Sequence, residues 1–238
     1  MAKKAGESGF RPITVEDHQA LGRSHAERKV TAVNDALQFP VGEAFDRDLT
    51  EILAGGAEER GEVVAIALID CDHFDHINRD FGPEEGDRVL IELGRYIAGA
   101  VPEEAKIYRI GGDEFGIIFH GTMEREEIFL FLNDLKNGYH VTTPDGEPQS
   151  ITIGMATAFE DASRCPELIR KADGALFRAK VSGRGKVAMA KEEKMVPKTS
   201  HFTQDQLQRL AKLSKREGVG EAILLREGLD LLLKKYDI

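Results

Sequence analysis

Hydrophobic positions in the middle of the chain alternate between one continuous apolar run and segments with helical spacing. Val63 to Ile69 is an unbroken β-branched and aliphatic run, which predicts a central strand buried on both faces. Asp35 to Leu53 and Gly86 to Ala100 place apolar residues on one stripe and predict two helices. Further elements are expected as helices over Glu124 to Lys136 and Pro166 to Val181, and a strand over Gln149 to Ala158. This alternation predicts an α/β or α+β fold.

A β-hairpin is predicted where two short apolar segments flank a polar turn. Ile107–Ile110 and Phe115–Phe119 lie on either side of the sequence Gly111-Gly112-Asp113-Glu114. Paired glycines supply the positive φ values that a tight hairpin turn needs, so we expect such values at Gly111 and Gly112.

Carboxylates cluster at the predicted end of the central strand. Asp70 and Asp72 are two residues apart and therefore point the same way on a strand. If Asp113 and Glu114 lie beside them, three or four carboxylates converge, and such a cluster does not stay ionised without cations. Mg²⁺ takes hard oxygen ligands together with substrate phosphates, so the pattern predicts two-metal phosphoryl transfer chemistry.

Composition narrows the class of protein. The 238 residues are 41% hydrophobic and 31% charged, a balance typical of soluble globular proteins. The longest apolar run is too short to cross a bilayer and the basic N-terminus lacks an apolar segment after it, so we expect a cytoplasmic protein without a membrane partner. Cys71 and Cys165 lack metal spacing and are expected to be buried reduced thiols.

Charge is uneven along the chain. The net charge is −10, which excludes a protein that coats nucleic acid over its whole surface. Residues 191–238 carry +2 and the remainder −12, and this shift predicts a separate C-terminal module.

The central motifs resemble the GGDEF family of diguanylate cyclases. Gly111-Gly112-Asp113-Glu114-Phe115 is similar to the family signature, and the resemblance continues in register in the segments Asp70–Asn78, Phe81-Gly82, Gly86-Asp87, Thr152–Ala156 and Ala172–Gly185. It covers residues 35–190. The resemblance implies a fold like the palm of nucleotidyl cyclases, with a central, partly antiparallel sheet wrapped by helices.

The resemblance also implies a metal site and a catalytic acid. Asp70 and Asp113 would ligate Mg²⁺ (or Mn²⁺), and the carbonyl of Cys71 would complete the protein ligands. Glu114 would support the site, and Asp113 would help to deprotonate the attacking 3′-hydroxyl.

The residues that the resemblance places around GTP are Phe74, Asp75, Asn78, Asp87, Lys180 and Arg184. Asn78 and Asp87 would bind the guanine edge, where a carboxylate accepts from N1–H and the exocyclic amine and so rejects adenine. Lys180 and Arg184, about one helical turn apart, would neutralise the triphosphate. Each domain of a homodimer would hold one GTP, and the product would be cyclic di-GMP with release of pyrophosphate.

Several positions depart from the family pattern. Asp75 replaces a lysine that is usual near the γ-phosphate, and Pro102 and Ala105 replace the Arg-x-x-Asp of the family's inhibitory product site. We therefore expect no product inhibition through that site. Asp75 also keeps an alternative open, a degenerate GGDEF protein that responds to GTP or cyclic di-GMP. A mixed GMP–AMP cyclase is disfavoured by Asp87.

The C-terminal module resembles a ribbon-helix-helix protein. Residues 1–34 are expected to be a tail or short helix near His18 to Val30, and 191–198 a linker. Within 199–238, Thr199–Thr203 predicts a short strand and Thr203 a helix cap. Two amphipathic helices follow, marked by Leu207, Leu210 and Leu213 and by Ala222, Leu225, Leu229 and Leu232. Two interpretations stay open, a module that binds DNA as a dimer and a helical hairpin that only dimerises.

Overall fold

The computed structural model describes residues 32–191, 198–217 and 220–236, and the chain divides into two compact units between Lys191 and Glu192. The expected helix near His18 to Val30 and most of the expected linker lie outside the described residues.

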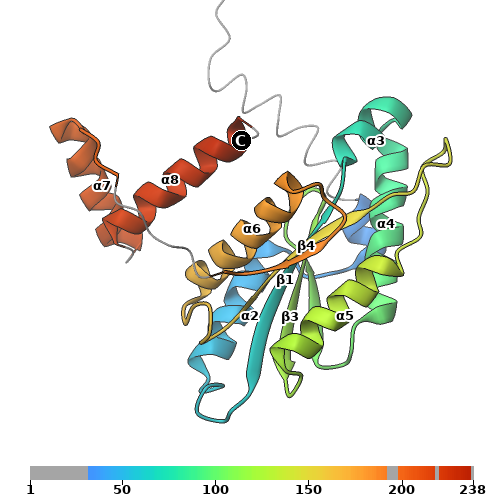
Figure 1. Ribbon diagram of the computed structural model, residues 1–238, viewed down its shortest axis with the longest axis horizontal. Coiled ribbons are helices and arrows are strands. Elements are labelled where there is room, and N and C mark those ends of the chain that lie inside the picture. Colours follow the sequence, from blue (N-terminus) through green and yellow to red (C-terminus); the bar gives the residue numbers. More distant parts are fainter. Residues whose placement is uncertain (1–31, 192–197, 218–219, 237–238) are drawn as a thin grey trace, which may run out of the picture. The chain divides into compact units, whose positions relative to one another are not determined.

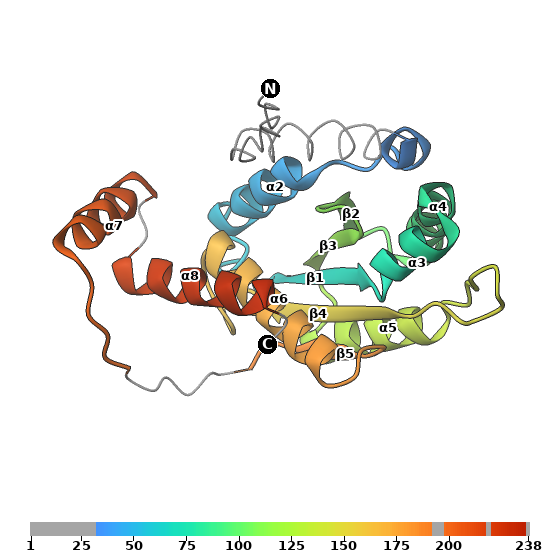
Figure 2. The same ribbon diagram turned by 90° about the horizontal axis from the view of Figure 1, so that it is seen from above.

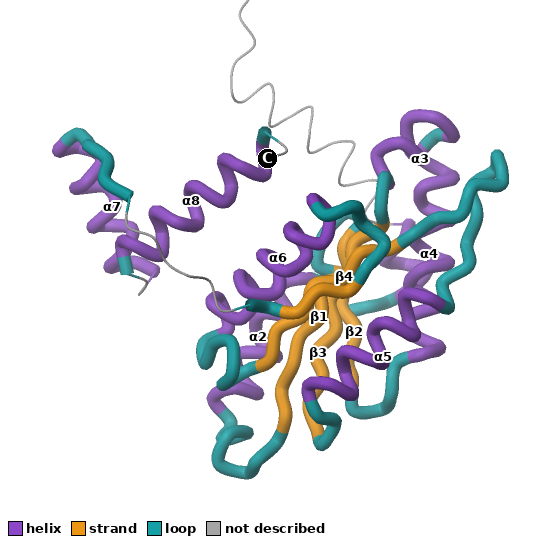
Figure 3. Tube along the Cα trace, in the orientation of Figure 1, coloured by secondary structure: helices purple, strands orange, loops and turns teal. Residues whose placement is uncertain are grey.

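A five-stranded mixed sheet forms the centre of the first unit (Figure 1, Figure 3). Its strands in chain order are β1 Val63–Cys71, β2 Ala105–Arg109, β3 Glu114–Gly121, β4 Ile151–Thr157 and β5 Val187–Met189. The spatial order is β2-β3-β1-β4-β5, with β4 and β5 parallel and all other neighbours antiparallel. The predicted buried central strand is confirmed, because β1 lies between two neighbours and is buried along nearly its whole length.

Helices cover both faces of this sheet (Figure 2). One face packs against α4 (Pro83–Ala100) and α5 (Arg125–Asn137), through residues such as Leu93 and Leu132. The other face packs against α2 (Gly42–Ala54) and α6 (Cys165–Val181), through residues such as Leu49 and Leu176. The α+β expectation is therefore confirmed, and Cys71 and Cys165 are buried free thiols as predicted.

Close contact between α6 and β4 depends on one glycine. A Cβ on Gly154 would collide with the backbone carbonyl of Ala172 and the backbone nitrogen of Leu176. Because these atoms belong to the helix backbone, they cannot move aside as a flexible side chain would. Gly154 thus fixes the distance between the helix that carries Lys180 and the sheet.

The single helix expected over Asp35 to Leu53 is wrong. Residues 32–37 are helical, but Gln38 has a φ of 54°, and α2 begins only at Gly42. Pro40 explains the break, since proline disfavours helical backbone in the residue before it and lacks an N–H donor. Val41, one of the apolar positions with helical spacing in this segment, directly precedes α2 and is 47% exposed.

Two short elements were not predicted. Helix α3 (Phe74–Phe81) has eight residues and buries only Ile77, so its apolar stripe is too short to register as a pattern. Strand β5 has three residues and joins the sheet beside β4.

The second unit contains α7 (Gln204–Glu217) and α8 (Glu221–Lys235). The predicted cap is confirmed: the backbone N–H of Gln206 donates to Thr203 Oγ1 at 3.2 Å, and that of Thr203 donates to Gln206 Oε1 at 2.9 Å. The predicted strand is wrong for the single chain, because residues 198–203 adopt no strand. A ribbon strand needs a partner strand for its hydrogen bonds, and among the described residues of one chain none pairs with this segment.

No helix among the described residues has the length and apolar character needed to cross a bilayer.

Candidate active site

The signature turn lies beside the end of the central strand. Asp70 pairs with Glu114 across β1 and β3, and the N–H of Cys71 donates to the carbonyl of Asp113 at 3.3 Å. The site is therefore built where β1 ends and β3 begins, on strands that the hydrophobic core holds from both faces. Phe115, the last residue of the signature, is fully buried and lies edge-on to Phe39 with ring centroids 6.3 Å apart.

The turn uses its glycines differently from the prediction. Neither Gly111 nor Gly112 has a positive φ, so the expectation of left-handed conformations is wrong. Gly111 instead leaves room for the Glu114 side chain, because a Cβ there would lie 2.9 Å from Glu114 Oε2. The N–H groups of Ile110 and Gly111 both donate to the carbonyl of Glu114, which closes the turn without left-handed backbone.

Asp70 is the most electrostatically perturbed carboxylate of this site. It is only 6% exposed, and burial raises its pKa to about 6, with further upward pressure from the charges of Asp113 and Glu114. Lys180 opposes the shift through an ion pair of 2.5 Å between its Nζ and Asp70 Oδ2. The three acids and one lysine thus interact as one electrostatic group.

The donor set fits a magnesium ion that binds together with phosphate. Among the described residues no three His, Cys, Asp or Glu side chains form a metal cage. Mg²⁺ usually takes only one or two carboxylates and fills its remaining positions with water and substrate oxygens. Asp70 and Asp113 supply that number. Cys71 could add only its carbonyl, because burial raises the pKa of its thiol.

Asp72 does not join this carboxylate group. It is 1% exposed and accepts hydrogen bonds from Ser150 Oγ at 2.7 Å, Thr152 Oγ1 at 2.6 Å and the N–H of Gly185 at 3.1 Å. The hypothesis that Asp72 contributes to a cluster of three or four carboxylates is therefore wrong. The two donor side chains come from β4 and the segment just before it, which sequence spacing cannot reveal.

The predicted guanine residues lie on adjacent helices. Asn78 is on α3 and Asp87 is on the first turns of α4, next to Gly86. A Cβ on Gly86 would collide with Asn78 Oδ1 and lie 3.1 Å from Phe74 Cζ. The absence of a side chain at Gly86 therefore leaves room for Asn78 and Phe74. The structure thus brings Phe74 and Asn78 to the turn that carries Asp87.

Asp75, in contrast, lies away from any packed surface. Its side chain is 78% exposed on the first turn of α3, where His76 Nε2 lies 3.6 Å away.

Arg184 is not on the helix that carries Lys180. Helix α6 ends at Val181, and Arg184 follows in a turn with a φ of 55° and an exposed side chain. The expectation of a one-turn helical spacing is therefore wrong. The turn is nevertheless closed onto the helix, because the N–H of Arg184 donates to the carbonyl of Ala179 at 3.0 Å.

Arg109 is a site residue that the sequence did not reveal. Its guanidinium is buried and donates to Asn34 Oδ1 at 3.0 Å and to the carbonyl of Gly112 at 2.6 Å. Burial lowers its pKa, whereas the charges of Asp87 and Asp113 raise it. Arg109 therefore places one positive charge between the predicted guanine residue and the signature turn.

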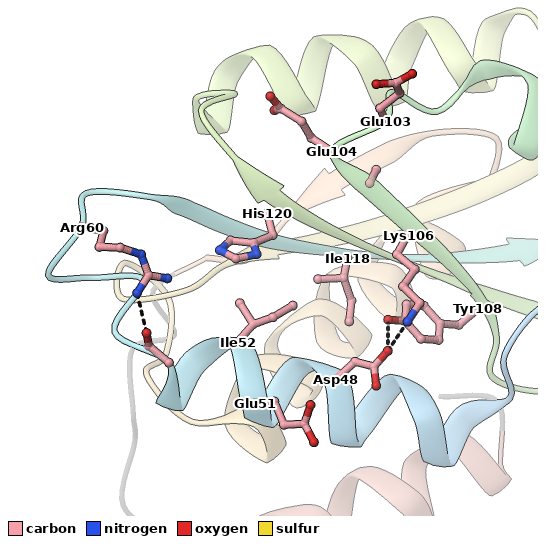
Figure 4. A pocket seen from close by; sticks show the side chains of 12 residues that line it. Asp48, Glu51, Ile52, Arg60, Glu103, Glu104, Lys106, Tyr108, Ile118 and His120 are labelled. Carbon is pink, nitrogen blue, oxygen red and sulfur yellow. Dashed lines mark hydrogen bonds and ion pairs between the residues drawn. The ribbon is translucent and has the colours of Figure 1, made fainter.

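A groove of about 700 Å³ lies at the opposite ends of β2 and β3 (Figure 4). Its lining includes Ala105, one of the two positions expected to lack the product-site motif, and the acids Asp48, Glu51, Glu103 and Glu104. Asp48 accepts hydrogen bonds from Tyr108 Oη, at 2.8 Å, and from Lys106 Nζ. The groove carries more acidic than basic side chains.

A mixed sheet with helices on both faces, and an acidic turn beside the end of its central strand, define an α+β domain. Residues 38–186 match the family model described as diguanylate cyclase, GGDEF domain, and residues 194–237 match a ribbon-helix-helix domain model. The chain therefore belongs to the GGDEF domain family.

Known proteins resemble the same region. The GGDEF domain of YfiN (TpbB) from Pseudomonas aeruginosa is 29% identical and superposes with a TM-score of 0.61, covering 66% of this chain and 92% of its own. The active GGEEF domain of a diguanylate cyclase from Vibrio cholerae has 23% identity and a TM-score of 0.59, covering 65% and 99%. An uncharacterized membrane protein of Staphylococcus aureus strain USA300 is 31% identical over 148 residues, 60% of this chain but only 41% of that protein. The chain spans less than half the length of the curated relatives that it matches.

Proposed function

We propose that this chain is a diguanylate cyclase that condenses two GTP molecules into cyclic di-GMP and releases two pyrophosphates, as a homodimer that uses Mg²⁺ (or Mn²⁺). The observation that carries the proposal is the group formed by Asp70, Asp113, Glu114 and Lys180 at the signature turn of a GGDEF domain. Carboxylates beside a half-buried lysine suit a triphosphate with a bound cation.

Asp70, Asp113 and the carbonyl of Cys71 would hold the cation, which supplies charge neutralisation for the triphosphate oxygens. Asp113 is partly exposed and is the acid best placed to accept the proton of the attacking 3′-hydroxyl. The Glu114 side chain lies close to the Gly111 Cα, and this position supports a role for Glu114 in shaping the turn. The 3′-oxygen then bonds to the α-phosphorus of the partner's GTP, and the bond to pyrophosphate breaks.

Lys180 and Arg184 would receive the phosphates. Lys180 Nζ already lies at the carboxylate group, and Arg184 presents its exposed side chain from the turn after α6. Asn78 and Asp87 would read the guanine edge, and Phe74 would pack beside them. Two domains related by a two-fold axis would each supply one such half-site.

The ribbon-helix-helix match supports a role for the C-terminal unit in bringing two chains together. Large side chains on its helices are exposed in the single chain, among them Leu225 at 41%, Leu229 at 53% and Leu232 at 51%. A second chain would cover them and would pair residues 198–203 into a ribbon, which could also contact DNA. Deletion of residues 191–238 should then convert the dimer to a monomer in analytical ultracentrifugation; a deleted chain that remains dimeric would contradict this role.

Cyclase activity is tested by incubating the full chain with GTP and Mg²⁺ and measuring cyclic di-GMP by mass spectrometry. Asp113→Ala should lower turnover at least about 100-fold, as expected when a group that acts on the transition state is removed. Asp134→Ala, which changes an exposed acid on α5, is the matched control and should leave turnover unchanged. Nucleotide binding without any product would contradict the proposal.

That last outcome would favour a second candidate function, a nucleotide-responsive regulator with a degenerate site. Asp75 is the observation that favours it, because an acid stands where a phosphate-binding lysine is expected. The match of the C-terminal unit to a DNA-binding type of module would give such a regulator its output.

A further inference from the structure

Asp72 is a buried acid that has no ion pair among the described residues. Its three hydrogen-bond donors are neutral: the hydroxyls of Ser150 and Thr152 and the N–H of Gly185. A buried carboxylate is costly unless donors compensate the lost hydration, and these donors supply that compensation. They come from β4, the segment before it and the turn after α6, and Asp72 therefore ties the end of β1 to all of these.

These bonds hold the Gly185 end of the turn after α6. Gly183, Arg184 and Gly185 have φ values of 109°, 55° and 56°, three successive left-handed residues. A non-glycine residue avoids this region unless its surroundings hold it there. The N–H of Gly185 is held by Asp72 Oδ2 at 3.1 Å and by Thr152 Oγ1 at 3.0 Å. Thr152 is itself oriented by donating to Asp72 Oδ1 at 2.6 Å.

Both anchors of the Gly185 N–H therefore depend on a single carboxylate. Removing Asp72 would take away one acceptor and release the hydroxyl that forms the other. The affected turn carries Arg184 and directly follows the last turn of α6, which carries Lys180. On the other side, Asp72 is only two residues from Asp70, whose carboxylate pairs with Lys180.

We infer that Asp72 is a positioning residue for the triphosphate of the substrate: it fixes the turn that carries Arg184 relative to the metal-binding end of β1. This inference rests on the proposed function and deepens it, because it assigns the phosphate side of the site to a residue that touches neither substrate nor metal. The guanine side, formed by Asn78 and Asp87 on α3 and α4, has no hydrogen bond to Asp72 among the described residues.

The side chain must be a carboxylate for this role. Asparagine has nearly the same shape, but its amide nitrogen would face a donor at one of the two oxygen positions. Asp72→Asn therefore disturbs the anchor with little change in volume. Thr152→Val removes only the second acceptor of the Gly185 N–H and keeps the side chain's shape. Ser150→Ala removes a donor that does not contact the turn through its own bond, and it serves as the matched control.

The test compares two ligands on the full chain with Mg²⁺, by calorimetric titration with guanosine 5′-(α,β-methylene)triphosphate and by displacement of that analogue with guanosine monophosphate. In Asp72→Asn the affinity for the triphosphate analogue should fall about tenfold, the size expected for one lost hydrogen bond to a charged group. The affinity for the monophosphate should change less than about twofold. Thr152→Val should show the same selective loss to a smaller degree, and Ser150→Ala should show neither change.

Equal loss for both ligands, or unchanged affinities with only a lower melting temperature, would overturn the inference and reduce Asp72 to a structural residue. If Asp72→Asn does not fold, the same criteria apply to Thr152→Val. A wild-type chain that binds neither nucleotide would instead overturn the proposed function, so the two failures are distinguishable.

Discussion

Lys180 Nζ lies 2.5 Å from Asp70 Oδ2, so the lysine proposed to bind phosphate and the carboxylate proposed to bind metal neutralise each other. Under the proposed function, GTP and its metal would separate this pair, because each partner would then take a new one. The ion pair would therefore link the occupancy of the two halves of the site.

Replacing Lys180 tests this link. Lys180→Met should lower the affinity for a non-hydrolysable GTP analogue at least about tenfold, because the triphosphate loses a charge-assisted contact. The same variant should bind Mn²⁺ more tightly than wild type in the absence of nucleotide, measured by electron paramagnetic resonance at pH 8, well above the Asp70 pKa of about 6. Lys171→Met, more than two turns earlier on α6, should change neither value; unaltered analogue binding by Lys180→Met would contradict the assignment.

Asp75 should weaken substrate binding through its charge alone. Asp75→Lys should raise the affinity for GTP, seen as a lower KM, and the gain should shrink with added salt because the side chain is 78% exposed. Asp80→Lys reverses an exposed charge on the same helix and is the control for a general effect of net charge. Equal gains in both variants would show that position 75 has no particular relation to the phosphates.

Gly86 should be essential for guanine binding although it offers no side chain. Gly86→Ala would push its Cβ against Asn78 Oδ1 and the Phe74 ring, so we expect weaker binding of both GTP and guanosine monophosphate. Gly99→Ala changes a glycine on the same helix where a Cβ meets nothing within 4 Å, and it should retain wild-type binding. Calorimetric titration of both variants separates these outcomes, and wild-type affinity in Gly86→Ala would contradict the guanine assignment.

Product inhibition should be absent or competitive. The groove at Ala105 carries more acidic than basic side chains, and the acids repel the two phosphates of cyclic di-GMP. Initial rates at several GTP concentrations should therefore show no noncompetitive component as cyclic di-GMP is added. Noncompetitive inhibition that disappears when residues 102–106 are substituted would overturn this prediction.

The charge of Asp48 should make the stability of the fold depend on pH in the acidic range. Hydrogen bonds, first from Lys106 and then from Tyr108 and Arg47, lower its pKa to about 2 from a usual value of 3.8. A carboxylate whose pKa is lower in the folded state stabilises the fold above its unfolded pKa and loses this contribution as the pH falls toward 2. Asp48→Asn should therefore be less stable than wild type at pH 6 in urea unfolding, and the difference should shrink between pH 4 and pH 2. A difference independent of pH would contradict the role of this charge.

The sequence predicted the elements whose apolar patterns are long. The run from Val63 to Ile69 is typical of a buried strand, and the apolar stripe of α4 is typical of an amphipathic helix. The family motifs then identified the domain to which they belong. The pattern failed where local backbone effects interrupt it, as at Pro40, and where an element is as short as α3 or β5.

Some site residues could likewise be recognised from the sequence, and others could not. Acids at a strand end, such as Asp70, are visible in sequence because a buried strand should not carry them. Asp72 and Arg109 were misjudged or missed because their partners lie far along the chain: Thr152 and Gly185 for Asp72, and Asn34 for Arg109. Only tertiary packing decides whether such a residue faces substrate or holds another element in place.

Residues 198–203 leave their backbone groups without a strand partner in the single chain. If a second copy provides that partner, the active form appears in proportion to the square of the chain concentration while most chains remain single. A twofold rise in the amount of chain would then raise the amount of dimer about fourfold. The level of gene expression would thus act as an input to the signalling output.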